Sequence, residues 1–69
     1  MTRYVCIAPS AGSKLGVATT IKLNDDTPTH VAVEAWQRQH GRDGQPAPCT
    51  WQYHEGDAIS ALVALARIS

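Results

Sequence analysis

The chain has 69 residues, 43% of them hydrophobic and 17% charged, and its six basic and six acidic residues give a formal net charge of zero. This composition supplies enough apolar material for a core and argues against a disordered chain, and the length leaves room for one domain spanning residues 1–69. Because no basic stripe is present to neutralise phosphates, we expect no direct binding to nucleic acid.

The first third of the chain predicts two strands. Residues 3–8 are rich in β-forming types and end at Pro9, which is typical of a strand that stops at a proline. Residues 17–23 alternate, which predicts a half-buried strand with one face made of Val17, Thr19, Ile21 and Leu23. The loop 10–16 contains Gly-Ser-Lys but not the order of a Walker motif, so we interpret it as the connection of an antiparallel hairpin.

The segment that follows predicts a helix over residues 28–40. An Asp or Thr directly before Pro28 is a helix-start signal, and capping is the simplest role for Asp25 and Asp26. Gly41 stands where a left-handed helix stop is expected. A helix would gather an apolar arc of Val31, Ala32, Val33, Ala35 and Trp36 and, on the opposite face, His30, Glu34, Gln37 and Arg38.

A strand is the alternative for the same segment. Residues 29–38 also fit a period of two, with Thr29, Val31, Val33 and Ala35 at every second position. If this alternative held, the architecture would become a four-stranded sheet with one helix.

The last third of the chain predicts a loop, a strand and a helix. Residues 41–48 contain two glycines and two prolines, and residues 49–54 then alternate as a strand does. Asp57 is placed to cap a final helix that runs to about Ile68. The predicted fold class is therefore α+β: a small antiparallel sheet of about three strands, in the order strand-strand-helix-strand-helix, packed against two helices.

The final predicted helix, residues 57–68, is apolar over more than half of its circumference. Its apolar positions are Ile59, Leu62, Val63, Leu65, Ala66 and Ile68. One interpretation buries this helix between the sheet and the other helix. The other leaves one face over for a homodimer or a partner protein.

The residue types that carry chemistry do not form a recognisable site in the sequence. Cys6, Cys49, His30, His40 and His54 lack the close pairs of structural zinc sites, so we predict no metal and no cofactor. We expect both cysteines to be free buried thiols. The aromatic residues are Tyr4, Trp36, Trp51 and Tyr53, and we expect the two tryptophans to provide the main bulk of the core.

The cellular setting predicted from the sequence is the cytoplasm. The short apolar run after Met1 is broken by Pro9, so we expect no signal peptide. No apolar stretch approaches the roughly 20 residues that cross a bilayer, so no membrane contact is expected.

These features favour a small non-enzymatic protein-binding module that acts by occupying a partner's surface. One form of this hypothesis is an inhibitor from a phage or mobile element, of the anti-CRISPR type, with a multi-subunit host defence complex as its partner. The expected contact surface is polar and consists of Asp25, Asp26, Glu34, Gln37, Arg38, Arg42 and Asp43.

Two other functions stay open at the level of sequence. One is a structural or regulatory subunit that forms a homodimer through the helix 57–68. The other is a small enzyme that uses Cys49 as a nucleophile together with a histidine.

Overall fold

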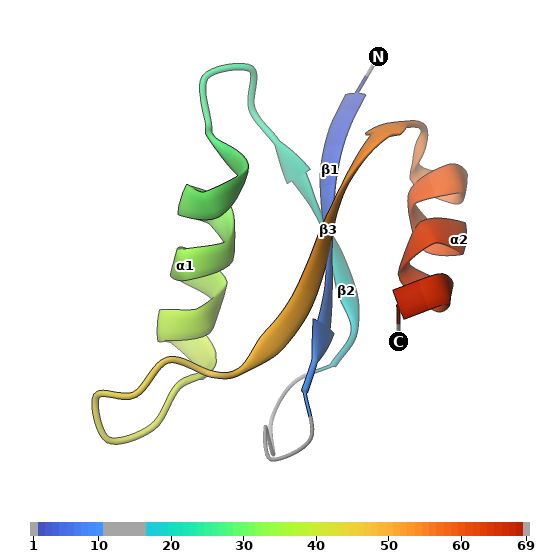
Figure 1. The fold of residues 1–69 in the computed structure, drawn as a ribbon. Coiled ribbons are helices and arrows are strands. Elements are labelled where there is room, and N and C mark those ends of the chain that lie inside the picture. Colours follow the sequence, from blue (N-terminus) through green and yellow to red (C-terminus); the bar gives the residue numbers. More distant parts are fainter. Residues whose placement is uncertain (1, 11–16, 69) are drawn as a thin grey trace.

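The computed structural model describes residues 2–10 and 17–68, and it has the predicted α+β fold with the predicted order of elements (Figure 1). These elements are β1 (Thr2–Pro9), β2 (Thr19–Leu23), α1 (Thr29–His40), β3 (Cys49–Gly56) and α2 (Ala58–Ile68). The segment 29–38 is helical, so the strand alternative for it is wrong. Most of the predicted loop 10–16 lies outside the described residues.

The three strands form one antiparallel sheet in the order β2-β1-β3, with β1 in the middle. Val5 faces Ile21 on β2 and Tyr53 on β3, and side chains directly opposite each other lie on the same face of a sheet. The two helices lie on opposite sides of this sheet (Figure 1). The expectation that α2 is buried between the sheet and α1 is therefore wrong.

The larger core lies between α1 and the sheet. Val5 and Ile7 on β1 are inaccessible to solvent and cluster with Val33 and Trp36 of α1. The cluster is completed by Leu23, Ala47 and three partly buried neighbours: Ile21, Ala32 and Cys49. Val31 and Ala35 of the predicted apolar arc are instead exposed, because the buried stripe of α1 is narrower than the arc.

The contact between α2 and the sheet is made by smaller side chains. Cys6 and Ala61 are both inaccessible, and the Cys6 thiol donates a hydrogen bond to the Ala61 carbonyl at 3.4 Å. Leu65 is the one large side chain among the buried residues of this helix. A small-residue contact lets α2 lie close to β1, but it uses only a narrow strip of the helix.

Both predicted end signals of α1 work differently in the structure. Pro28 is the N-cap residue and no side chain caps the helix, so the predicted capping role of Asp25 and Asp26 is wrong. Gly41 has an extended backbone with φ −79°, so it is not a left-handed stop. The left-handed residues that follow this helix are Asp43 and Gly44, at φ 54° and 77°.

These two residues form the tight turn that reverses the chain after α1. The Arg42 amide donates to the Gln45 carbonyl at 3.1 Å, and the Gln45 amide donates to the Arg42 carbonyl at 2.8 Å. Asp-Gly is a favoured pair for a two-residue turn with positive φ at both positions. The turn brings the Gln45 carbonyl against Gly41, where a β-carbon would collide with it.

Gly41→Ala is therefore expected to destabilise the protein more than Gly44→Ala. An alanine at 41 must push the Gln45 backbone away, which disturbs the turn and costs roughly 1–3 kcal/mol. Gly44 has open space around it, so alanine there costs only the strain of a positive φ, about 1 kcal/mol. Urea unfolding of the two variants measures both values, and equal losses would contradict the close-approach argument.

Candidate interaction site

The predicted polar contact residues fall into two groups in the structure. Asp25 and Asp26 are exposed in the turn before α1, whereas Arg42 and Asp43 are exposed in the turn beyond its other end. The 12 residues of α1 separate these groups by about 18 Å. A single partner would have to span the whole helix to contact all seven residues.

The three predicted contact residues on α1 differ in solvent exposure. Glu34 and Arg38 are exposed on the outer face of the helix. Gln37 is half-buried, and its side-chain amide donates to the Ala47 backbone carbonyl at 3.1 Å. The backbone carbonyl of Gln37 accepts from the Ala47 amide at 3.0 Å. Gln37 therefore anchors the loop before β3, a role that the sequence pattern did not indicate.

The strand β3 carries an exposed aromatic pair. Trp51 is 44% exposed and Tyr53 38% exposed, and residues two apart on a strand share one face. Register places them beside Ile7 and Val5, on the face that α1 covers. The expectation that Trp51 belongs to the core is wrong: β3 is an edge strand, and the core under α1 reaches Cys49 at its start but not Trp51.

Arg3 of β1 holds the tyrosine of this pair in place. Its Nε donates to the Tyr53 hydroxyl at 3.2 Å, and its guanidinium carbon lies 5.6 Å from the centre of the Tyr53 ring. The Tyr53 hydroxyl in turn donates to Glu55 Oε1 at 3.1 Å. Arg3 also donates to the backbone carbonyls of Asn24 and Asp25, at 3.0 and 3.3 Å. Arg3 thus links Tyr53 on β3 to the turn that contains the predicted contact residues Asp25 and Asp26.

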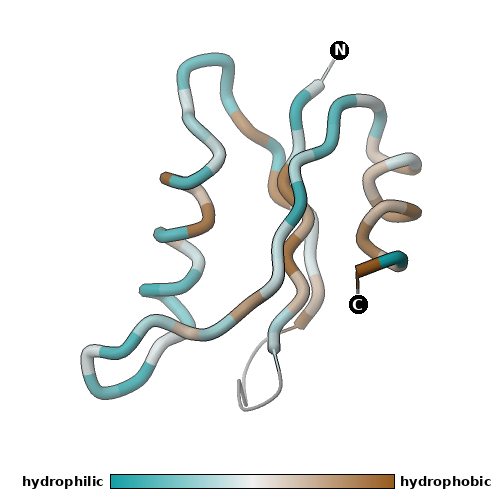
Figure 2. Tube along the Cα trace, viewed as in Figure 1, coloured by the Kyte–Doolittle hydropathy of each residue, from teal (hydrophilic) through white to brown (hydrophobic). Residues whose placement is uncertain are grey.

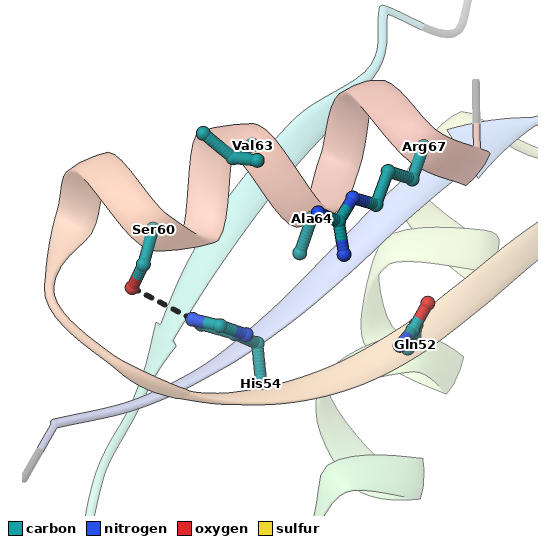
Figure 3. Close-up of a pocket in the computed structure, with 6 residues that line it drawn as sticks. All are labelled: Gln52, His54, Ser60, Val63, Ala64 and Arg67. Atoms are coloured by element: carbon teal, nitrogen blue, oxygen red, sulfur yellow. Dashed lines mark hydrogen bonds between the residues drawn. The ribbon is translucent and has the colours of Figure 1, made fainter.

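The other face of β3 forms one wall of a pocket against α2, with a volume of about 330 Å³ (Figure 3). Gln52 and His54 line it from the strand. The helix contributes four residues that share one side at helical spacing: Ser60, Val63, Ala64 and Arg67. A second pocket of about 390 Å³ lies beside the C-terminal end of α1, with Arg38 as its one charged lining residue.

His54 and Ser60 form the closest polar contact in the β3–α2 pocket, with Nε2 and Oγ 2.8 Å apart (Figure 3). Ser60 Oγ also accepts from the Asp57 amide at 3.2 Å and donates to the Asp57 carbonyl at 3.0 Å. The Ser60 amide donates to Asp57 Oδ1 at 2.7 Å. These reciprocal bonds form a capping box, so Asp57 caps α2 as the sequence predicts.

This arrangement explains why glycine precedes the cap. A β-carbon on Gly56 would lie 2.6 Å from Ser60 Oγ and 3.0 Å from His54 Nε2. The Ser60 hydroxyl also contacts the Asp57 amide and carbonyl, so its contact with His54 is part of the cap of α2. The contacts of Asp57 with Ser60, and the space that Gly56 leaves for them, therefore fix where α2 begins.

The environment of the two cysteines does not activate them. Both are free thiols, as predicted, but only Cys6 is buried, whereas Cys49 is half-buried. Register puts Cys6 on the α2 face and Cys49 on the α1 face. Burial raises the pKa of both thiols, whereas a nucleophilic cysteine needs a lowered pKa. Cys49 and His54 point to opposite faces of β3, so the strand does not bring them together.

Among residues 2–10 and 17–68, no group of three or more metal-ligating side chains is gathered to hold an ion. Neither of the two described helices has the length and apolarity of a membrane span.

Comparison with protein-family models, with curated proteins and with solved structures finds no match to this chain. The candidate site therefore rests on the geometry of its own residues.

The cap of α2 is expected to make stability depend on pH in acid. Hydrogen bonds from the Ser60 amide and hydroxyl, together with the charge of His54, lower the pKa of Asp57. A lowered folded-state pKa contributes stability above the unfolded value of about 3.9, and this contribution is lost as pH falls through the folded pKa.

Asp57→Asn tests this directly because asparagine caps helices about as well and does not titrate. Thermal unfolding between about pH 2 and pH 7 should show a smaller loss of stability in acid for the variant than for the unchanged protein. Parallel curves would show that the cap does not depend on the charge of Asp57.

Proposed function

We propose that this protein is a non-enzymatic protein-binding module that occupies a partner's surface, and that it does so along the β3 edge. The observation that carries the proposal is the exposed pair Trp51 and Tyr53 on an edge strand. The outer side of β3 has no neighbouring strand within the described residues. An extended segment of a partner can add to such an edge through backbone hydrogen bonds.

The chemistry of the edge favours this mode of binding. Tryptophan, tyrosine and arginine are the residue types most enriched among those that dominate binding energy. Because Arg3 already fixes the Tyr53 ring through a hydrogen bond and a ring contact, little side-chain freedom remains to be lost on association. Glu55 and the nearby Asp25 and Asp26 then supply a polar rim.

In this proposal, the remaining predicted contact residues make additional contacts outside the β3 edge. Glu34, Arg38, Arg42 and Asp43 are exposed on and beyond α1, where a partner larger than one segment would also meet them. An inhibitor of the anti-CRISPR type would act in this way, by covering part of a host complex. That form of the proposal is supported by the exposure of these four polar residues, which a large partner can reach.

The aromatic pair supplies the main test. Trp51→Ala and Tyr53→Ala are each expected to weaken binding by about 30-fold, as residues worth about 2 kcal/mol do. The partner is first captured from a lysate of the native host, with salt washing and mass spectrometry, and the dissociation constants are then measured with the purified partner. Val31→Ala is the matched control, because Val31 is 42% exposed but lies on α1.

The outcome that would contradict the proposal is equally definite. If both aromatic variants stay folded by circular dichroism and bind as the unchanged protein does, the β3 edge is not the contact surface. If Glu34→Arg or Arg38→Glu abolishes binding instead, the contact lies on α1.

Strand addition can be separated from contact through side chains alone. If a partner segment pairs with β3, the amides on its outer edge gain hydrogen bonds and should exchange more slowly with deuterated solvent. Hydrogen exchange of the complex measured residue by residue shows whether this protection occurs between Cys49 and Gly56. Unchanged exchange in a stoichiometric complex would rule out strand addition.

A further inference from the structure

The outer face of α2 carries three of the exposed large hydrophobic residues in the described part of the chain. Ile59 is 75% exposed, Leu62 57% and Val63 51%, and Ala66 is exposed beside them. Spacings of three, four and seven residues place these four side chains on one stripe of the helix, which we call the α2 stripe. Figure 2 shows hydrophobic colouring along most of α2, in contrast to the mostly hydrophilic colouring of α1.

The α2 stripe is also free of charge. No charged residue occurs between Ala58 and Ala66, and the charged residues nearest to this stretch are Asp57 before it and Arg67 after it. A surface without charges can meet an identical surface without like-charge repulsion. The stripe offers no charged group to a partner that binds through ion pairs.

We propose that the α2 stripe packs against the α2 stripe of a second copy of this chain. The two helices would run antiparallel about a two-fold axis that passes between Leu62 and Val63. Such an axis places Ile59 of one copy against Ala66 of the other at both ends, and Leu62 against Val63 in the middle. Each layer then pairs a larger side chain with a smaller one, as closely packed helices require.

The charges at the helix ends favour this orientation over a parallel one. Asp57 marks the N-terminal end of α2 and Arg67 the C-terminal end. In an antiparallel pair the Asp57 end of each helix lies near the Arg67 end of the other, and the two helix dipoles also oppose each other favourably. In a parallel pair, like charges and like dipole ends would lie together.

The size of the contact surface limits how tightly two copies are expected to bind each other. Each helix has 11 residues and is about 16 Å long, so the pair buries less than the roughly 1,600 Å² of a standard protein interface. The dimer is therefore expected to dissociate in the micromolar range, where mass depends on concentration.

Sedimentation equilibrium of the unchanged protein, from about 5 to about 500 μM, is the first measurement. The weight-average mass should rise from that of the 7.4 kDa chain toward twice that value. Leu62→Glu places two carboxylates next to the two-fold axis, and it should raise the dissociation constant at least tenfold. The matched control is Val31→Glu, which puts the same charge on an exposed apolar position of α1 and should leave the dimer unchanged.

A swap of layer residues tests the antiparallel register. Ala66→Ile alone would set two large side chains against each other at both ends of the helix pair and should weaken the dimer. Adding Ile59→Ala to it restores one large and one small side chain in each layer, so the double variant should regain most of the lost affinity. Both positions are exposed, and thermal unfolding checks that the monomers stay folded.

The proposal is overturned if the unchanged protein remains monomeric up to about 500 μM, which would leave the stripe to a different protein. It is also overturned if the dimer persists undiminished in Leu62→Glu. A failure of the swap to restore affinity would remove the antiparallel register. These outcomes are independent of the β3 proposal, which is tested on the opposite face of the sheet.

Discussion

The structure depends on β1 being buried on both faces and paired along both edges. Val5, Cys6 and Ile7 are inaccessible, and Ala8 is nearly so, although successive residues of a strand point to opposite sides. The central strand therefore supplies core to α1 on one side and to α2 on the other. In this chain of 69 residues, both halves of the core therefore pack against the same strand.

This constraint determines where unburied apolar surface can occur. With β1 fully used, large apolar side chains stay exposed on elements that have one side left over, among them β3 at the sheet edge and α2 on its outer side. The core under α1 takes the large side chains Trp36, Ile7 and Leu23, whereas the contact under α2 is built around Cys6 and Ala61. A contact made of small residues covers only a narrow strip of α2, which is why its outer stripe remains exposed.

The sequence predicts much of the fold because alternation and helix signals are local properties. Residues 3–8, 17–23 and 49–54 all appear in strands, with ends that differ by two residues or fewer. The segment 29–38 supported two interpretations because its apolar residues fit both periods. The buried positions that decide between them, Val33 and Trp36, are three residues apart, a helical spacing.

The candidate site was less predictable because it depends on the order of strands in the sheet. The alternation of Cys49, Trp51 and Tyr53 shows which residues share a face, but not whether a helix covers that face. Only the order β2-β1-β3 reveals that β3 lies at the edge. The polar residues of α1 were visible as a pattern, yet the loop contact that engages Gln37 involves Ala47, ten residues away, and has no sequence signal.

The two proposed surfaces lie on opposite sides of the sheet, and this arrangement has a consequence for binding. Trp51 and Tyr53 share the face of Val5 and Ile7, whereas α2 packs on the face of Cys6. A dimer formed through the α2 stripe would therefore leave both aromatic faces uncovered. One dimer would present two equivalent β3 edges related by a two-fold axis, and a partner with two matching segments would be held more tightly than one edge alone could hold it. Weak self-association and a small binding edge would then act together, because each compensates for the limited surface that so short a chain can offer.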